Sequence, residues 1–445
     1  MTVSTGTRAP GVEAPDGVGV PVEETRVALG RALRIALVHG REEASRRAVA
    51  HLALASGAEI VARVRATDPR SFVEAAQALR DAKPDVVVIQ GGPKDEGALS
   101  ELLEALRLGC GAQRPMPRVL ALVDMRVAHA LRMRASPFEF ERFAAASELV
   151  DSLRHLRRAG NGDVVLRDAL IEDGARALAA TNATTALAVD VTERSTSLVL
   201  ARPDGRIEAA HLVPLGLGMG ADHVVVRASL DNVRRWLPWP IDAPALLERV
   251  FNRTRQPVGG AATTGATVLL EMALAREAIA HALRDAADAG LDVAAMRSAP
   301  SILITGQAAS LPKAGQSLLV LVDGLEPNAV STVYREPDEG RAERIAMVVS
   351  VVTRRSAKIR IVRASGRNLA QVAPGSFGLV PMGADVEVAV NGAGVRGHGQ
   401  SGELGVLIDA RGRPLSLPER DAERIPAVTR WHAALQAISE NTAPT

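Results

Sequence analysis

One segment of the chain combines a carboxylate and hydroxyls at a spacing that suits phosphate chemistry. The apolar run Leu187–Val189 ends on Asp190, and a polar stretch follows before Ser197–Leu200 resumes the apolar pattern. Apolar runs of this length between turn residues predict two buried strands, hence a hairpin with Asp190 at its tip. Such a carboxylate can hold Mg²⁺ through water, while the hydroxyls of Ser195 and Thr196 face phosphates. An ordinary solvent-exposed β-turn explains the same residues without a ligand, and the residues alone favour that simpler explanation.

A second candidate is the loop that begins with Gly91 and Gly92. It follows the apolar run Asp85–Gln90 and precedes a predicted helix. In α/β sheets ligands bind beyond the carboxyl ends of strands, and a helix N-terminus favours anions. Lys94 and Asp95 are therefore placed to contact a polar ligand. The alternative is a solvent-exposed connection without function, because glycine loops are common.

A third segment contains Gly216, Gly218 and Gly220. Its glycines depart from the G-x-G-x-x-G spacing, which argues against a dinucleotide site and leaves a flexible segment that packs on a phosphate tail. The chain also has no G-x-S-x-G elbow and no Walker A loop. These motifs indicate ligand binding and no particular reaction.

The elements that would position these loops alternate between strand and helix in the first part of the chain. Alternation at this spacing predicts a parallel sheet with helices on both faces. The predicted strands are Arg34–Val38, Glu59–Val64, Asp85–Gln90 and Arg118–Val123, and the helices between them are Glu42–Ser56, Ser71–Ala82 and Leu99–Leu108.

The second part carries the Asp190 hairpin and a predicted helix, Thr267–Ala289, followed by a strand, Ser301–Thr305, that leads into Gly306. Eleven glycines between Gly366 and Gly412 then predict a small β domain with many turns. The predicted organisation is a flexible leader (1–30), an α/β domain (31–137), a helical connector (138–162), a second α/β domain (163–353) and a β-rich C-terminal domain with a tail (354–445).

Composition excludes several classes of function. The 53 basic and 51 acidic side chains nearly balance, which argues against a nucleic-acid surface. A single cysteine, Cys110, excludes an intramolecular disulfide and a thiolate zinc site. The sequence has no apolar run of about 18 residues that would span a bilayer. Met1–Glu24 lacks the features of a signal peptide, so we expect a cytoplasmic protein.

The order of the segments resembles the glutamate mutase-associated MutL-type family, which belongs to the actin-like (sugar kinase/Hsp70) ATPase superfamily and not to the mismatch-repair proteins of the same name. Asp85–Gly92 with Asp95 and Gly97 resembles its strand and Gly-Gly-Thr-Asp-Gly-Gly loop, and Ala188–Val191 with Ser195–Ser197 resembles its phosphate hairpin. The likeness covers most of the chain from about residue 34 onward. Further segments follow in the family's order: Leu215–Ala221, Arg235–Pro238, Glu271–Ala278, Ile304–Gln307, Leu321–Pro327 and Gly405–Pro418.

The resemblance implies an actin-like fold that binds ATP and Mg²⁺. By analogy Asp190 approaches the Mg²⁺-phosphate group and is the catalytic candidate. The predicted nucleotide-binding residues are Ser195, Thr196, Gly216, Gly218, Gly306 near the adenosine, Gly91, Gly92 and Asp95.

Three departures from the family set this chain apart. The family's N-terminal phosphate loop is not found, so we expect a chain truncated at that end. Thr192, Glu193 and Arg194 replace small residues, and their Cβ atoms and the Glu193 carboxylate oppose a phosphate. Gln307 and the two alanines after it stand where the family has Gly-Gly beside the adenine.

Three hypotheses follow. The first is an accessory factor of the chaperone or reactivation type for another enzyme, by resemblance a cobalamin-dependent mutase such as glutamate mutase. It is not the mutase itself, and its nucleotide hydrolysis is lost or weak. The second is an active Mg-ATP-dependent ATPase whose first phosphate clamp comes from Gly91–Gly97 or from a partner chain. The third is a structural actin-like protein that assembles with copies of itself. None of them involves a nucleic acid or a membrane.

Overall fold

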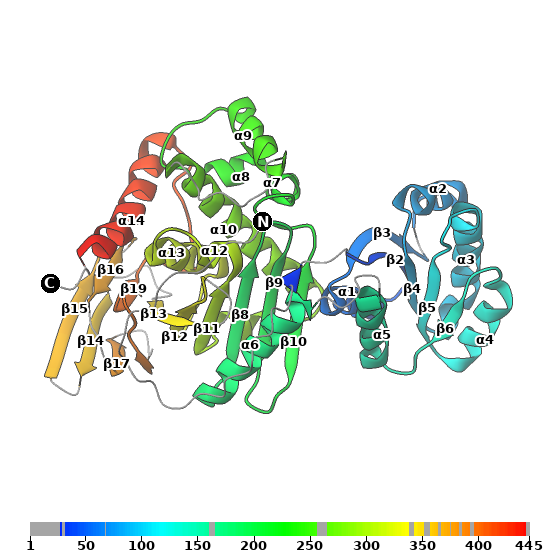
Figure 1. Ribbon diagram of the computed structural model, residues 1–445, viewed down its shortest axis with the longest axis horizontal. Helices are drawn as coiled ribbons and strands as arrows, with labels where there is room; N and C mark the ends of the chain where they lie inside the picture. The colour runs from blue at the N-terminus through cyan, green and yellow to red at the C-terminus, as the bar shows by residue number, and fades with distance from the viewer. Residues whose placement is uncertain are drawn as a thin grey trace, which may run out of the picture.

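The structure, a computed structural model, describes residues 27–28, 32–66, 68–159, 165–255, 265–337, 342–350, 357–363, 366–373, 375–381, 385–391 and 396–441. These residues form an α/β protein with a parallel five-stranded sheet and a mixed eight-stranded sheet, which confirms the predicted α/β class (Figure 1). Apart from Val27–Ala28, which form the short strand β1, the predicted leader lies outside the described residues.

The first unit is built on the parallel sheet, in the order β3-β2-β4-β5-β6. Alternate residues of its strands face opposite layers of helices, as the pleat requires. Ile35 and Leu37 pack with α1 and α5, whereas Ala36 and Val38 pack with α2, α3 and α4. Helices therefore cover both faces, as the alternation of elements predicts. The elements are β2 (Arg34–His39), α1 (Glu43–Ser56), β3 (Glu59–Arg65), α2 (Phe72–Ala82), β4 (Val86–Gly91), α3 (Glu96–Cys110), β5 (Arg118–Val123), α4 (Met125–Arg134), β6 (Phe140–Arg142) and α5 (Ala146–Ala159).

Local signals set where the helices of this unit begin. The Ser71 hydroxyl accepts from the amide of Glu74, whose carboxylate accepts in turn from the amide of Ser71, so α2 begins with a capping box. The Asp124 carboxylate accepts from the amide of Val127 and caps α4 in the same sense.

The segment predicted as a helical connector, 138–162, takes part in the first unit. Its first residues form β6, which pairs with β5. In α5, Leu149 and Leu153 are fully buried against the sheet. Local periodicity shows the helix but does not show that it belongs to this core.

The second unit is built on the eight-stranded sheet, in the order β10-β9-β8-β11-β12-β13-β19-β16. Strands β8, β9 and β10 form an antiparallel meander, and β11 and β12 continue from β8 in parallel. Helix α6 covers one face, and α10 and α13 cover the other. The strands are β8 (Ala186–Val191), β9 (Thr196–Ala201), β10 (Ile207–Leu212), β11 (Ser301–Thr305), β12 (Val330–Arg335), β13 (Glu343–Ser350), β16 (Phe377–Val380) and β19 (Val406–Asp409).

The helices of this unit lie mostly between β10 and β12. The long one, α10, agrees with the predicted helix to within two residues at its first end and one at its last. The helices are α6 (Arg167–Asn182), α7 (Ala221–Ala228), α8 (Leu230–Arg234), α9 (Ala243–Arg255), α10 (Gly265–Asp288), α11 (Val293–Arg297), α12 (Gly306–Ala309) and α13 (Ala314–Leu325).

The C-terminal part contributes to both a small sheet and the main one. The small sheet is antiparallel, in the order β15-β14-β17-β18, with β14 (Ala357–Arg363), β15 (Gly366–Val372), β17 (Asp385–Asn391) and β18 (Arg396–Gln400). Strands β16 and β19 join the eight-stranded sheet, and α14 (Asp421–Asn441) packs on α13. The region predicted as β-rich thus also carries a long helix.

The two units meet where α1 contacts β10, and they lie side by side in Figure 1. The short strands β1 and β7 (Val165–Leu166) pair in parallel. None of the helices in the described part of the chain is long and apolar enough to cross a membrane.

Candidate functional site

The hairpin around Asp190 is present, and most of its turn is buried. Asp190 pairs with Ser197 across β8 and β9. In the turn, the amide of Thr192 donates to the carbonyl of Ser195 (2.9 Å), and the amide of Ser195 donates to the hydroxyl of Thr192 (3.0 Å). Thr192, Ser195 and Thr196 are all buried. The turn is therefore less exposed than an ordinary surface β-turn, with Glu193 and Arg194 half-buried at its tip.

The glycine segment that follows β10 covers this turn. The amides of Gly218 and Gly220 both donate to the carbonyl of Glu193, at 2.9 and 3.1 Å. A Cβ on Gly216 would lie 2.4 Å from the backbone nitrogen of Arg194, so only glycine permits this approach. The structure thus brings the predicted residues Gly216 and Gly218 to the hairpin, where their backbone packs against the turn itself.

The hydroxyls predicted to face phosphates also have partners inside the protein. The Thr196 hydroxyl donates to the carbonyl of Leu215 (2.8 Å). The Ser195 hydroxyl lies 3.0 Å from that of Thr192. Because buried polar groups are stable when paired in this way, the turn holds its own conformation without a ligand.

Asp190 is 1% exposed and has a built-in cation. Nε of Arg167, the first residue of α6, lies 3.2 and 3.1 Å from its two carboxylate oxygens, and Nη2 donates to Oδ1 at 2.9 Å. The Thr305 hydroxyl donates to the same Oδ1 at 2.7 Å. A two-pronged guanidinium contact is the strongest partner a carboxylate finds among side chains. The oxygens that would hold Mg²⁺ through water are therefore engaged by Arg167 and Thr305.

Gly306 lies directly against this carboxylate. Its φ is +71°, and a Cβ there would be 2.6 Å from Oδ1 of Asp190 and 2.5 Å from the carbonyl oxygen of Val191. Glycine is required for both reasons. The structure thus brings Gly306, predicted to lie near an adenosine, to the Asp190 carboxylate. No group of three or more His, Cys, Asp or Glu side chains within the described ranges could hold a metal ion.

The loop with Gly91 and Gly92 lies at the point where the first sheet reverses its strand order. Loops at such a switch point diverge and commonly bind ligands. Here Asp95, which is 2% exposed, spans the gap: its Oδ1 accepts from the amide of Arg41 (3.0 Å) and its Oδ2 from that of Gly92 (3.2 Å). A Cβ on Gly40 would lie 2.0 Å from Oδ2. Asp95 therefore joins two loops, and of the two predicted contact residues only Lys94 is exposed.

The predicted residues thus fall into two separate groups. Gly91, Gly92 and Asp95 belong to the five-stranded sheet, whereas Asp190 and Gly306 belong to the eight-stranded one (Figure 1). The two groups therefore do not form a single site.

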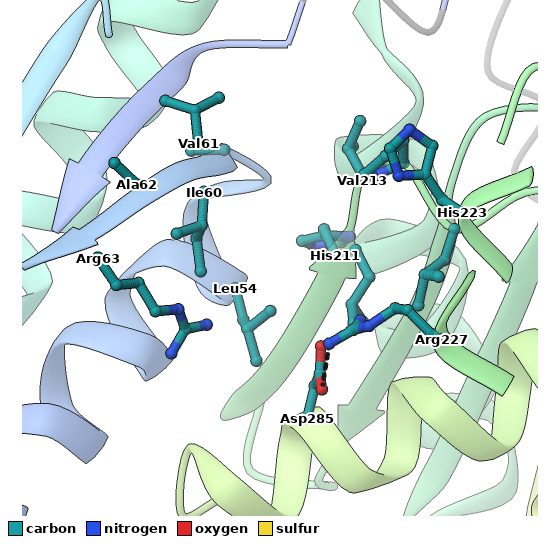
Figure 2. A pocket seen from close by; sticks show the side chains of 14 residues that line it. Leu54, Ile60, Val61, Ala62, Arg63, His211, Val213, His223, Arg227 and Asp285 are labelled. Atoms are coloured by element: carbon teal, nitrogen blue, oxygen red, sulfur yellow. Dashed lines mark hydrogen bonds and ion pairs between the residues drawn. The ribbon is translucent and has the colours of Figure 1, made fainter. Parts of the chain in front are cut away.

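A cavity of about 450 Å³ lies between the two units (Figure 2). Ile60 and Val61 of β3 face it from the first unit, and Val213 after β10 faces it from the second. β3 and β10 are each the outermost strand of their sheet. At one end Arg227 and Asp285 form a two-pronged ion pair of 2.7 and 2.9 Å.

His211, in the wall of this cavity, connects the units through buried polar contacts. Its Nδ1 lies 2.9 Å from the Ser197 hydroxyl, and its Nε2 lies 3.2 Å from Oε1 of Glu172. Glu172 in turn pairs with Arg154 of α5 at 2.6 Å. Burial alone would raise the pKa of Glu172, but His211 and Arg154 lower it. Because both ring nitrogens of His211 have partners, its role is to join elements.

A third cluster, which the motif search did not assign to any site, is a buried network of arginines and aspartates. Arg276, 1% exposed, places Nε 2.8 Å from Oδ2 of Asp323. Arg411 donates to Oδ1 of Asp323 at 2.6 Å and to both oxygens of Asp409 at 2.9 Å. Arg413 donates to Asp409 at 2.7 Å. Three guanidiniums thus share two carboxylates.

The network is extended by a neighbouring pair. Oε1 of Glu277 accepts from Nη2 of Arg235 (2.9 Å) and from the indole nitrogen of Trp236 (2.7 Å). The guanidinium carbons of Arg235 and Arg276 lie 5.1 and 5.0 Å from the centroid of the Trp236 ring. Cation–π contacts of this length stabilise desolvated arginines.

Aromatic rings and electrostatics confirm how strongly charged this interior is. The guanidinium carbon of Arg411 lies 3.9 Å from the Phe377 ring centroid and 4.6 Å from that of Trp431. Burial alone would raise the pKa of Asp409, but Arg411 and Arg413 hold it well below its usual value. The Asp409 carboxylate is therefore ionised inside the protein.

The sequence signals the buried charges of this network, but not which of them pair. Its members come from segments already singled out by resemblance, Arg235–Pro238, Glu271–Ala278, Leu321–Pro327 and Gly405–Pro418. Each places a charge within or beside an apolar run, and a charge on a buried face needs a partner. Segments far apart in the sequence therefore carry opposite charges that each require a buried partner.

The sequence matches none of the protein-family models and none of the curated proteins with which it was compared.

Proposed function

We propose that this protein is a divergent actin-like protein of the glutamate mutase-associated MutL type that acts on another enzyme as an accessory factor and does not hydrolyse nucleotide. The topology of the second unit is compatible with one half of an actin-like core. It has an antiparallel meander, β8 to β10, continued by parallel strands that are joined through helices.

The observation that carries the proposal is the contact between Arg167 and Asp190. A metal–phosphate site needs an acidic side chain whose oxygens are open to the ion or its water. In this chain a guanidinium and the Thr305 hydroxyl occupy the Asp190 carboxylate. The built-in cation replaces the charge that Mg²⁺ would supply, so Asp190 becomes part of the framework.

The glycine segment supports the same conclusion. A phosphate hairpin presents free backbone amides to its ligand. Here Gly216 is pressed against Arg194, and the amides of Gly218 and Gly220 are used by the carbonyl of Glu193. A protein that keeps this framework but closes the site is suited to binding a protein partner. By resemblance, that partner is a cobalamin-dependent mutase.

The test is titration calorimetry of the full chain with Mg-ATP, together with a hydrolysis assay. We expect no saturable heat at micromolar ATP and no turnover above the buffer rate. Micromolar binding with turnover that Asp190→Asn abolishes would instead establish the active ATPase. Gel filtration of the chain mixed with a purified cobalamin-dependent mutase tests the partner, and separate elution of the two would contradict it.

A further inference from the structure

A second cavity lies beside the arginine network, on the face of the eight-stranded sheet that α10 and α13 cover. Its walls come from α10, from the end of α13, from α11 and from the segment after β19. Its volume is about 330 Å³, at the lower end of the range for small-molecule sites. It shares Arg235, Pro414 and Leu415 with a wider cavity of about 590 Å³. A small ligand therefore fits it, with an approach through the wider cavity.

The arginines that line this cavity exceed the carboxylates available to them. The exposed Arg284 and the half-buried Arg297 line it, and neither forms an ion pair with a carboxylate within the described ranges. Nη1 of Arg284 lies 3.3 Å from Nε2 of His281, a ring whose pKa is lowered by burial. Nη1 of the deeply buried Arg276 has no hydrogen-bond partner in the part of the chain that the structure describes. Nε of Arg297 also lacks a hydrogen-bond partner among the described residues, and buried donors of this kind on Arg276 and Arg297 favour an oxyanion.

The carboxylates in the wall do not cancel this surplus. Oδ1 of Asp323 accepts from Arg411, and its Oδ2 forms an ion pair with Nε of Arg276 at 2.8 Å but has no hydrogen-bond partner among the described residues. Oε1 of Glu326 accepts from the amide of Leu415 (3.1 Å). Oε1 of Glu277 is taken by two donors, but its Oε2 has no hydrogen-bond partner among the described residues. A ligand that carries a donor beside its oxyanion would satisfy that oxygen as well.

The remaining wall is apolar. Ala280, Leu283 and Ala287 line the cavity from α10 at a spacing that places them on one face of the helix. Val293 of α11 lines it as well. The cavity is therefore amphipathic, with guanidiniums at its polar end and a short hydrophobic wall.

From these features we propose that the cavity binds a small organic oxyanion with a short apolar chain and an adjacent hydrogen-bond donor, the chemistry of an aliphatic amino acid. The oxyanion contacts Arg284 and Arg297, and the donor contacts Glu277. This site is independent of Asp190 and of nucleotide, and it gives the accessory protein a means to respond to a metabolite.

The test uses three probes with the full chain: norvaline, pentanoate, which lacks the ammonium group, and glycerol phosphate, which carries phosphate and hydroxyls but no aliphatic chain. Calorimetry and the fluorescence of Trp236, which lines the cavity, report binding. We expect norvaline to bind with a dissociation constant below about 1 mM, and pentanoate more weakly. Tighter binding of glycerol phosphate would overturn the amino-acid assignment. Absence of saturable binding by all three would overturn the site.

Two variants decide which residues act. Arg284→Ala with Arg297→Ala removes two guanidiniums that form no ion pair with a carboxylate in the described part of the chain, and should weaken norvaline binding by about tenfold or more. Glu277→Gln keeps an acceptor for Arg235 and Trp236 and should remove the advantage of norvaline over pentanoate. The matched control is Arg206→Ala, an exposed arginine paired with Asp204 on the turn between β9 and β10. Equal norvaline affinity in the double variant and the control would contradict the proposal, and Asp190→Asn should leave binding unchanged.

Discussion

The turn around Asp190 and the network around Asp323 are both buried and charged, but they balance their charges differently. Asp190 has one guanidinium, from Arg167, and one hydroxyl, so its oxygens are engaged. In the network, Arg276, Arg411 and Arg413 share two aspartates, and guanidinium nitrogens remain without hydrogen-bond partners in the described part of the chain.

The unpaired donors that a ligand could use lie in the network and not in the turn. The motif that resembles a phosphate site occurs where side-chain and backbone groups already form hydrogen bonds with one another. The surplus of hydrogen-bond donors occurs in the segments around Arg276 and Arg411, which contain no phosphate-binding motif. A ligand contributes most where the protein leaves polar groups unpaired, because pairing them removes a desolvation cost.

The largest expected effect comes from removing the centre of the network. Asp323→Ala leaves two buried guanidiniums, Arg276 and Arg411, without their shared carboxylate. Breaking a buried ion pair from one side costs about 3–5 kcal/mol. Denaturant unfolding followed by tryptophan fluorescence measures this loss. Asp204→Ala, which breaks an exposed pair with Arg206, should cost less than about 1 kcal/mol. Equal losses in the two variants would show that the network adds no stability.

The next effect comes from uncovering the Asp190 carboxylate. Arg167→Ala should destabilise the fold by about 2 kcal/mol, because a buried acceptor loses its charged donor. It should also create a response that the natural protein lacks. With the guanidinium gone, Mg²⁺ should raise the melting temperature of the variant in a concentration-dependent way.

The double variant Arg167→Ala with Asp190→Asn is the control for that response, since the carboxylate is then absent. Mg²⁺ should leave its melting temperature unchanged. A natural protein that Mg²⁺ already stabilises through Asp190 would contradict the closed-site interpretation and erase the contrast between the two regions.

A smaller effect is expected at the other aspartate that the motifs singled out. Asp95→Ala removes the acceptor that joins the amides of Arg41 and Gly92. The expected loss in the free energy of unfolding is about 1–2 kcal/mol. Lys94→Ala, at the exposed neighbouring position, should change it by less than about 0.5 kcal/mol. If the two variants behave alike, Asp95 does not hold the loops together.

Much of the fold could be predicted because it depends on local periodicity. The alternation of strands and helices places β2 at Arg34–His39, one residue longer than predicted, and β11 at Ser301–Thr305 as predicted. The turn after Asp190 is less exposed than its sequence suggests, for a non-local reason. Its residues are polar, but Gly216–Gly220 returns from beyond β10 and covers part of them.

The sites were harder to predict because they depend on pairs distant in the chain. Arg167 precedes Asp190 by 23 positions, and only the packing of α6 under β8 brings them together. Arg276, Asp323 and Arg411 come from two helices and a loop. Their presence in apolar runs signals buried charge, but it does not say which charge meets which.

The finest test of the network is its response to pH through His432 of α14. Burial and the charge of Arg276 lower the pKa of this histidine to about 3, whereas the unfolded chain takes up the proton near pH 6.5. Acid therefore favours unfolding, and the stability that the neutral ring contributes is lost as the pH falls from about 6.5 toward 3. Other histidines with pKa values lowered by burial, among them His39 and His281, add to the same slope. His432→Leu should reduce the slope of unfolding free energy between pH 6 and 4 by about 1 kcal/mol per pH unit. If this variant keeps the natural slope, the ring is not held neutral inside the protein, and the contrast with the balanced charges at Asp190 loses its electrostatic basis.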